Sequence, residues 1–371
     1  MAQRVSWDEY FLQIAALAAT RSTCLRRNVG CVLVRDGRII GEGSTLKVGN
    51  DHAEIQAIKH CLAQGESPRG ATAYVTLEPC SHHGRTPPCA TRLVEEGVAR
   101  VVAAMVDPYH EVAGQGLALL RAAGIVADVG LLEAEARRVH RGFLSRVERQ
   151  RPWVTLKAAA TLDGKTALLN GKSQWITGPA ARADVQALRA RSCAILTGSG
   201  TVAADNPRLT VRDFAVERQP LRVVVEGVMC ADSAEREIFS DGGATLLACA
   251  LPHPAHQVRL RAQGVRVQAL PAANNPAKVD LAALLQQLGR EGINEVLVEA
   301  GMSLNGALLH AGLVDELVLY LAPVTLGHDS RGLFGIPPLP GLEQAQRWRW
   351  HDISRVGDDI RLTLRRPPEK T

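Results

Sequence analysis

Three metal-binding side chains limit how the first half of this chain folds. His52, Cys80 and Cys89 offer one nitrogen and two sulfur ligands, a set that suits a tetrahedral Zn²⁺. A catalytic zinc takes three ligands from the protein and keeps its fourth position for water. Glu54 lies two residues after the histidine, where its carboxylate is free to move protons near that water. The chain is therefore expected to bring distant segments together around one ion.

Segments around these ligands alternate between helix and strand. Ser6 and Glu9 form a capping box, which predicts a helix from Ser6 to about residue 20. Asp36-Gly37 predicts a hairpin turn, and Asp51 is expected to cap a helix that begins with His52. The remaining expected elements are strands at 29–34, 38–42, 71–77, 98–106 and 125–129, and helices at 52–62, from Pro87-Pro88 to before Gly97, and at 115–123. This alternation predicts an α/β layered domain, with zinc where two helix starts converge beside the sheet.

A polar segment at residues 146–152 ends in Pro152 and precedes a new β-rich run. We interpret it as the boundary between a zinc domain at residues 1–147 and a second domain at residues 150–371. The second domain is expected to contain strands at 153–159, 194–197, 221–226, 245–249, 265–268, 295–299 and 316–321, and helices at 180–190, 281–290 and 303–311. It is therefore also expected to be α/β.

Composition limits the kinds of partner. The 371 residues allow two domains of roughly 150 residues each. The net charge of +5 is scattered, with no basic tail and no basic-aromatic run of the kind that binds single-stranded nucleic acid. No apolar stretch reaches the roughly 18 residues needed to cross a bilayer, and the first residues lack the apolar core of a signal peptide. Eight cysteines without an export signal favour reduced thiols. We expect a cytoplasmic protein with a small, phosphate-bearing substrate and no nucleic-acid or membrane partner.

The pattern His-x-Glu followed by Pro-Cys indicates a hydrolytic removal of an amino group, as in the zinc deaminases. Zinc lowers the pKa of water toward neutrality, and Glu54 would pass a proton from that water to the departing ammonia. The alternative is a structural zinc, with His82 or His83 as the fourth ligand and Glu54 as an ordinary helix-start residue. Eight residues separate Cys80 from Cys89, where two are usual in these enzymes.

The chain resembles the bifunctional deaminase/reductase family of riboflavin biosynthesis over nearly its whole length. In the first domain the resemblance lies in residues 74–89, Asp107-Pro108 and residues 112–116. In the second domain it lies in residues 156–159, 162–165, 173–177, 200–202, 205, 209–212, 298–301 and 315–317. The order of the two domains is also that of the family.

This resemblance implies a cytidine-deaminase-like N-terminal domain with three α/β/α layers and a dihydrofolate-reductase-like C-terminal α/β domain. The first would deaminate 2,5-diamino-6-ribosylamino-4(3H)-pyrimidinone 5′-phosphate. The second would reduce the ribosyl side chain of the product with NADPH, giving 5-amino-6-(5-phosphoribitylamino)uracil. A homo-oligomer, a dimer or larger, is also implied.

The resemblance further assigns individual residues. His52, Cys80 and Cys89 would bind zinc, and Glu54 would be the catalytic proton donor. NADPH would contact Ala159, Trp175, Thr201, Asp205, Gly301, Met302 and Ser303. The reductase substrate would contact Ser173, Arg189, Leu209, Arg212 and Glu299. Backbone N–H groups at a strand-to-helix turn suit a cofactor phosphate and arginines suit a sugar phosphate, although an ordinary turn and solvated arginines are the alternatives.

Two departures from the family fall on the wall that should contact the deaminase substrate. Leu25-Arg26-Arg27 replaces the usual Pro-Asn-Pro, and Thr45 replaces a histidine. Residues 21–30 resemble the same region of deoxycytidylate deaminases instead. Two alternatives to the riboflavin enzyme therefore stand. One is a paralogue acting on a related phosphoribosyl pyrimidine in a secondary-metabolite pathway, with altered or lost deaminase specificity. The other is a nucleic-acid-binding or structural zinc module without turnover.

Overall fold

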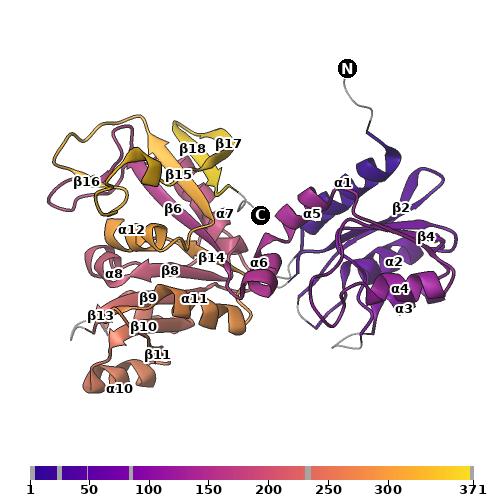
Figure 1. The fold of residues 1–371 in the computed structure, drawn as a ribbon, viewed down its shortest axis with the longest axis horizontal. Helices are drawn as coiled ribbons and strands as arrows, with labels where there is room; N and C mark the ends of the chain where they lie inside the picture. Colours follow the sequence, from indigo (N-terminus) through magenta and orange to yellow (C-terminus); the bar gives the residue numbers. More distant parts are fainter. Residues whose placement is uncertain (1–4, 23–26, 48, 83–86, 230–234, 368–371) are drawn as a thin grey trace. The chain divides into compact units, whose positions relative to one another are not determined.

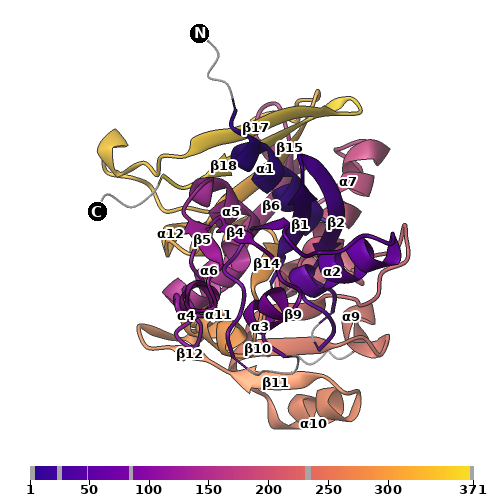
Figure 2. The same cartoon turned by 90° about the vertical axis from the view of Figure 1, so that its right-hand side faces the viewer.

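The computed structural model describes residues 5–22, 27–47, 49–82, 87–229 and 235–367. The chain divides into a first unit, Met1–Gln150, and a second unit, Arg151–Thr371 (Figures 1 and 2). The division falls within the polar segment at residues 146–152, whose first four residues form the end of helix α6 (Arg141–Arg149). Within the described ranges, no helix is both long and apolar enough to span a membrane.

A five-stranded sheet forms the middle layer of the first unit, in the order β2-β1-β3-β4-β5. Strand β1 runs antiparallel to β2 and β3, whereas β3, β4 and β5 are parallel. The strands are β1 (Gly30–Arg35), β2 (Arg38–Ser44), β3 (Thr72–Val75), β4 (Arg100–Ala103) and β5 (Val126–Val129). The carboxyl ends of β3 and β4 therefore meet at one edge of the sheet, where α/β proteins bind their ligands.

Helices cover both faces of this sheet, and glycines allow the close approach. A Cβ on Gly30 of β1 would lie 2.0 Å from the Ala15 carbonyl oxygen of α1. A Cβ on Gly43 of β2, which points to the opposite face, would lie 2.4 Å from the Ala53 oxygen of α2. Helices α3 and α4 lie on the α2 side, and α5 contacts α1 (Figure 1). These helices are α1 (Trp7–Ala19), α2 (Ala53–Ala63), α3 (Cys89–Glu95), α4 (Gln115–Ala122) and α5 (Glu133–Val139). The predicted three-layer α/β/α fold is confirmed.

Two local predictions in this unit are confirmed. The Ser6 N–H donates to Glu9 Oε2 at 2.7 Å, and the Glu9 N–H donates to Ser6 Oγ at 3.2 Å, so the capping box starts α1. Asp36 and Gly37 have φ angles of 51° and 72°, the positive values that a two-residue hairpin turn of type I′ requires. Short-range sequence signals were sufficient here because each depends on residues within one turn.

The predicted cap of α2 is wrong. His52 occupies the N-cap position, and its side chain makes no capping hydrogen bond. The Asp51 carboxylate instead accepts hydrogen bonds from Gln56 at 2.5 Å and Lys59 at 2.6 Å. Asp51 is one residue too early to reach the free N–H groups of the helix start. The His52 side chain is consequently free for another role.

One buried carboxylate ties the loop after β4 to the loop after β3. Glu78 accepts hydrogen bonds from the backbone N–H groups of Asp107 at 3.1 Å, Gly114 at 2.9 Å and Gly116 at 2.8 Å. Gly116 must lack a side chain, since a Cβ there would lie 1.9 Å from the Pro79 carbonyl oxygen. Residues 107–117 are therefore held against the loop that carries a predicted metal ligand.

A buried histidine gives this unit a predictable acid sensitivity. His140, at the junction of α5 and α6, is 2 % exposed, and its Nε2 lies 3.2 Å from the Thr76 carbonyl oxygen. Burial lowers the pKa of His140 from 6.5 to about 4, and the charge of Arg27 acts in the same direction. Between those pH values the unfolded chain binds more protons, so stability falls as the pH falls. The loss across this window is about 3 kcal/mol.

We expect His140→Gln to remove most of this pH dependence, because Gln retains an N–H donor for Thr76 and does not titrate. The free energy of unfolding of both proteins is measured in urea at pH 7 and pH 4. The wild type should lose about 3 kcal/mol more than the variant between these pH values. Equal losses would show that His140 does not charge on unfolding.

A nine-stranded sheet forms the centre of the second unit, in the order β11-β10-β9-β8-β14-β6-β15-β18-β17. The strands from β11 to β15 in this order are parallel, and β18 and β17 are antiparallel additions. The strands of the sheet are β6 (Trp153–Thr161), β8 (Ala194–Gly198), β9 (Leu221–Val228), β10 (Thr245–Leu251), β11 (Arg266–Ala269), β14 (Glu295–Val298), β15 (Glu316–Ala322), β17 (Arg349–Val356) and β18 (Asp359–Arg365). The predicted α/β class is confirmed.

Helices and two small two-stranded sheets, β12-β13 and β16-β7, complete the second unit. The helices are α7 (Pro179–Arg191), α8 (Ser199–Asp205), α9 (Glu237–Ser240), α10 (Pro254–Ala262), α11 (Leu281–Arg290) and α12 (Met302–His310). The short strands are β7 (Lys165–Ala167), β12 (Pro271–Ala272), β13 (Asn275–Val279) and β16 (Arg331–Gly332). Every strand and helix predicted for this unit is present. Helices α8, α9 and α10, the four short strands and the edge pair β17–β18 were not predicted.

Candidate active sites

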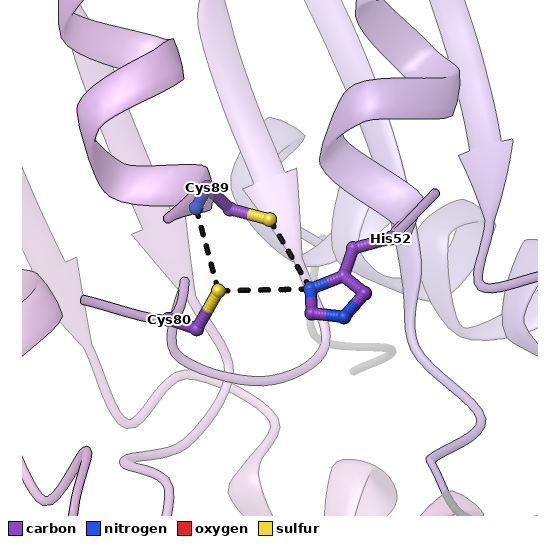
Figure 3. Close-up of side chains that lie close together, drawn as sticks. All are labelled: His52, Cys80 and Cys89. Carbon is purple, nitrogen blue, oxygen red and sulfur yellow. Dashed lines mark hydrogen bonds between the residues drawn. The ribbon is translucent and has the colours of Figure 1, made fainter. Parts of the chain in front are cut away.

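The three predicted zinc ligands converge at two helix starts (Figure 3). His52 is the N-cap of α2, Cys89 is the first residue of α3, and Cys80 lies in the loop after β3. His52 Nδ1 lies 3.3 Å from Cys89 Sγ and 3.6 Å from Cys80 Sγ. The three ligand atoms all lie within 4.8 Å of one another. One imidazole and two thiols at this spacing fit a tetrahedral zinc.

The ligands shift one another's pKa values. Hydrogen bonding with Cys89 and His52 lowers the pKa of Cys80 to about 4. The bond to Cys80 raises the pKa of His52, and the bond to Cys80 together with burial raises the pKa of Cys89. The Cys89 N–H, at the start of α3, also donates to Cys80 Sγ at 3.3 Å. A thiolate stabilised by a helix start is the form of cysteine that binds metal.

Glu54 is the buried carboxylate beside this group. It lies in the first turn of α2 and is 3 % exposed, and burial raises its pKa to about 7. A structural zinc would need a fourth protein ligand. Among the described residues the metal-binding group has three members, and His82 is not one of them. His83, the other candidate, lies outside the described residues.

A buried charge cluster lies across neighbouring strands of the second unit. Arg189 of α7 donates from Nε and Nη2 to the two carboxylate oxygens of Glu299, at 2.6 and 2.9 Å. Glu299 follows β14, and the parallel register between β14 and β6 sets it beside Lys157. Burial alone would raise the pKa of Glu299. The positive charges of Arg189, Lys157 and Arg212 outweigh this effect and hold that pKa below its usual value. Three predicted substrate residues, Arg189, Arg212 and Glu299, thus interact electrostatically in one cluster that also contains Lys157.

Two helix starts near this cluster fit a dinucleotide phosphate. Gly198 and Gly301 are the N-cap residues of α8 and α12, at the carboxyl ends of the adjacent parallel strands β8 and β14. A Cβ on Gly301 would lie 3.7 Å from Thr201 Oγ1, so the two starts are close together. Thr197 Oγ1 is buried and has no hydrogen-bond partner in the described structure. Backbone N–H groups and an unpaired hydroxyl suit the phosphates of NADPH.

The other predicted residues lie around these two groups or on an exposed loop. Their positions are Ala159 on β6, Ser173 and Trp175 in the loop between β7 and α7, Asp205 at the end of α8, Leu209 and Arg212 in the segment that follows, and Met302 and Ser303 in the first turn of α12. Trp175 is 70 % exposed, and its ring contacts the Arg182 guanidinium at 4.6 Å. The described contacts of Trp175 do not join it to the charge cluster.

Lys157 was missed as a candidate site residue. It lies partly buried in β6, with Nζ 5.9 Å from the ring centre of Tyr320, and burial lowers the pKa of its ammonium group. A sequence signal was present, since a lysine in the middle of an apolar central strand is rarely left without a partner. Its neighbour Glu299 is far away in the sequence, so the pair itself could not be predicted.

A zinc-dependent deaminase joined to an α/β reductase is the class of protein that these two units define. Residues 5–105 match the cytidine and deoxycytidylate deaminase zinc-binding region, and residues 152–362 match the RibD C-terminal domain. The second match covers more than half of the chain. The chain belongs to the RibD family of riboflavin biosynthesis proteins.

Relatives match over the full length of both units. The riboflavin biosynthesis protein RibD of Escherichia coli K12 is 46% identical over 96% of this chain and 99% of its own. The Acinetobacter baumannii RibD structure has a TM-score of 0.85 and 38% identity, covering 97% of this chain and 98% of its own. A Thermotoga maritima structure has a TM-score of 0.83 and 32% identity, covering 97% and 99%. It is described as a diaminohydroxyphosphoribosylaminopyrimidine deaminase/5-amino-6-(5-phosphoribosylamino)uracil reductase.

These comparisons confirm the predicted bifunctional enzyme of riboflavin biosynthesis, with Zn²⁺ and NADPH as cofactors. They also confirm the predicted pair of a cytidine-deaminase-like domain and a reductase domain. They offer no support for the secondary-metabolite alternative.

Proposed function

We propose that the first unit deaminates a diaminohydroxyphosphoribosylaminopyrimidine and that the second unit reduces the resulting 5-amino-6-(5-phosphoribosylamino)uracil. The observation that supports the first assignment is the convergence of His52, Cys80 and Cys89 beside the buried Glu54. The substrate names are those of the Thermotoga maritima relative, whose structure matches this chain over both units. This assignment also divides the two activities between residues 1–147 and residues 150–371.

In the first unit, His52, Cys80 and Cys89 would hold zinc, which lowers the pKa of water and so supplies a nucleophile at neutral pH. Glu54 transfers protons. Its carboxylate accepts a proton from the attacking water and delivers it to the amino nitrogen, which leaves as ammonia. Burial suits this role because a carboxylate shielded from solvent exchanges protons with the substrate and not with bulk water.

In the second unit, NADPH supplies the hydride, and the helix starts at Gly198 and Gly301 would hold its phosphates. Reduction of the opened ribosylamine, in its imine form, adds one hydride to carbon and one proton to nitrogen. Lys157 is the residue placed to donate that proton, because burial weakens its hold on it. Arg189 fixes Glu299 through two hydrogen bonds, so the negative charge of Glu299 is held beside Lys157.

The proposed division of labour is tested with the zinc-loaded protein and the diaminopyrimidine phosphate. Ammonia release and NADPH oxidation are followed separately. We expect ammonia release without NADPH, and NADPH oxidation only after deamination or on addition of the deaminated pyrimidine. NADPH oxidation without ammonia release from the diaminopyrimidine would contradict the assignment of deamination to the first unit. Ammonia release without any NADPH oxidation would contradict the assignment of reduction to the second unit.

Loss of a thiol ligand should empty the metal site. We expect Cys89→Ser to bind zinc at least about 100-fold more weakly, because a neutral hydroxyl replaces a thiolate ligand. Zinc is measured by metal analysis of the purified full-length protein after dialysis. Cys61→Ser is the matched control, since Cys61 is a free buried thiol of the same unit outside the ligand group. Full zinc occupancy in Cys89→Ser would show that the ligand set is wrong.

We also propose that the protein is a cytoplasmic homo-oligomer, a dimer or larger. β17 is an edge strand of the nine-stranded sheet, and its Trp350 and Ile353 side chains are 63 % and 62 % exposed. Apolar side chains on an open strand edge favour pairing between copies. The six described cysteines are free thiols, as expected in a reducing compartment. Sedimentation of the wild type and of a Trp350→Lys variant tests the oligomer, and a monomeric wild type would contradict it.

A further inference from the structure

Arg27 is held in a fixed position by three side chains of the first unit. Its Nη1 lies 3.1 Å from Asp107 Oδ2, whose side chain is completely buried. Its guanidinium carbon lies 4.7 Å from the ring centre of Phe143 and 5.6 Å from that of Tyr109. Aromatic faces and a buried carboxylate restrict the guanidinium plane. Arg27 is therefore a pre-organised positive charge and not a mobile surface side chain.

This fixed charge lies at the edge of the sheet that carries the zinc ligands. Asp107 follows β4 as Cys80 follows β3, and these strands are parallel neighbours. The Asp107 N–H donates to Glu78, two residues before Cys80, at 3.1 Å. These contacts hold Asp107, and with it Arg27, against the loop that carries Cys80.

Arg27 has more hydrogen-bonding capacity than its partners use. A guanidinium carries five N–H donors, and Asp107 is its ion-pair partner within the described part of the chain. The Arg27 side chain is 24% exposed, whereas the Asp107 side chain is 0% exposed. The ion pair with Asp107 uses Nη1, and among the described residues no hydrogen-bond acceptor is recorded for Nε or Nη2 of this partly exposed guanidinium. Such a fork matches the oxygens of a phosphate.

We propose that Arg27 binds the phosphate ester of the deaminase substrate. The proposal rests on the proposed function, in which that substrate is a phosphoribosyl pyrimidine. Asp107 and the two rings keep the guanidinium oriented, so little side-chain entropy is lost when the phosphate binds. Arg27 stands where the family usually has a proline, so this contact would be a feature of this chain.

The test must separate phosphate binding from neutralisation of Asp107. Arg27→Gln alone leaves a buried carboxylate without its counter-charge, which can unfold the site. The main variant is therefore Arg27→Gln combined with Asp107→Asn, which keeps an oxygen to accept the Tyr109 N–H. Asp107→Asn alone shows the effect of the anchor, and Arg69→Gln, an exposed arginine of the same unit, is the matched control.

The KM for ammonia release is measured with the phosphorylated diaminopyrimidine and with its dephosphorylated nucleoside. We expect the double variant to raise the KM for the phosphorylated substrate about 10- to 100-fold, so that the preference for phosphate largely disappears. Zinc content and NADPH oxidation of the deaminated pyrimidine should match the wild type. Equal changes in KM for both substrates, or no change for the phosphorylated one, would overturn the proposal.

A second measurement keeps the two proposals distinguishable. Ribose 5-phosphate binding to the zinc-loaded full-length protein is followed by calorimetry, which requires no turnover. Absence of ammonia release by the wild type would contradict the proposed function alone. In that case loss of one class of ribose 5-phosphate site in the double variant would still support the role of Arg27, and unchanged binding would overturn it.

Discussion

Glu54→Gln should abolish ammonia release while leaving zinc bound. The amide has nearly the shape of the carboxylate, but it neither accepts nor delivers a proton at neutral pH. Glu54 is not one of the three metal-binding residues, so the ligand set of His52, Cys80 and Cys89 stays complete. We expect kcat for ammonia release to fall on the order of 10⁴-fold, the upper range for loss of a general acid–base group. Ammonia release is measured under saturating diaminopyrimidine phosphate, with zinc determined on the same sample.

Two controls make this result specific. NADPH oxidation with the deaminated pyrimidine should be unchanged, because that reaction is assigned to the other unit. Replacing a buried carboxylate by an amide removes a desolvated charge, so the fold should be at least as stable as the wild type. A Glu54→Gln protein that retained full zinc and released ammonia within tenfold of the wild-type rate would eliminate Glu54 as the proton carrier.

The zinc ligands could be predicted because they lie in short motifs whose residue types and spacing are typical of zinc enzymes. His52 and Glu54 are two residues apart, and Pro79 precedes Cys80 directly, so each short motif carries its own signal. The structure adds what no motif contains: the loop after β3 and the starts of α2 and α3 come together, so that the three ligand atoms lie within 4.8 Å of one another. The prediction for Asp51 failed because capping depends on the position of the helix start to within one residue, and the sequence does not fix that position so closely.

Pairs that are distant in sequence could not be predicted. Arg27 and Asp107 lie in two loops that only the folded sheet brings together, and Lys157 and Glu299 lie side by side only because of the register between β6 and β14. The edge hairpin β17–β18 was missed for a different reason. Most side chains of β17 are exposed, so the strand lacks the apolar alternation that identifies half-buried strands. Its two-residue turn, with Gly357 at a φ of 64°, was the available signal.

Lys157→Met should abolish NADPH oxidation while ammonia release continues. Met keeps the length and apolar stem of lysine, so it fills the space in β6 next to Tyr320 without adding a polar group. It has no proton to give to the imine nitrogen. The two hydrogen bonds between Arg189 and Glu299 do not involve Lys157, so they should be unaffected. We expect kcat for NADPH oxidation to fall about 10²- to 10⁴-fold.

The pattern of KM and kcat distinguishes proton donation from a packing role. A proton donor acts on the chemical step, so kcat should fall while the affinities for NADPH and the deaminated pyrimidine remain near those of the wild type. Lys278→Met, on an exposed strand of the same unit, is the matched control and should behave like the wild type. Arg189→Lys should also reduce kcat, because a single ammonium cannot hold both oxygens of Glu299 and the carboxylate charge would be fixed less well beside Lys157. If Lys157→Met raised KM with kcat unchanged, the lysine would bind substrate without donating the proton, and the second unit would need another acid.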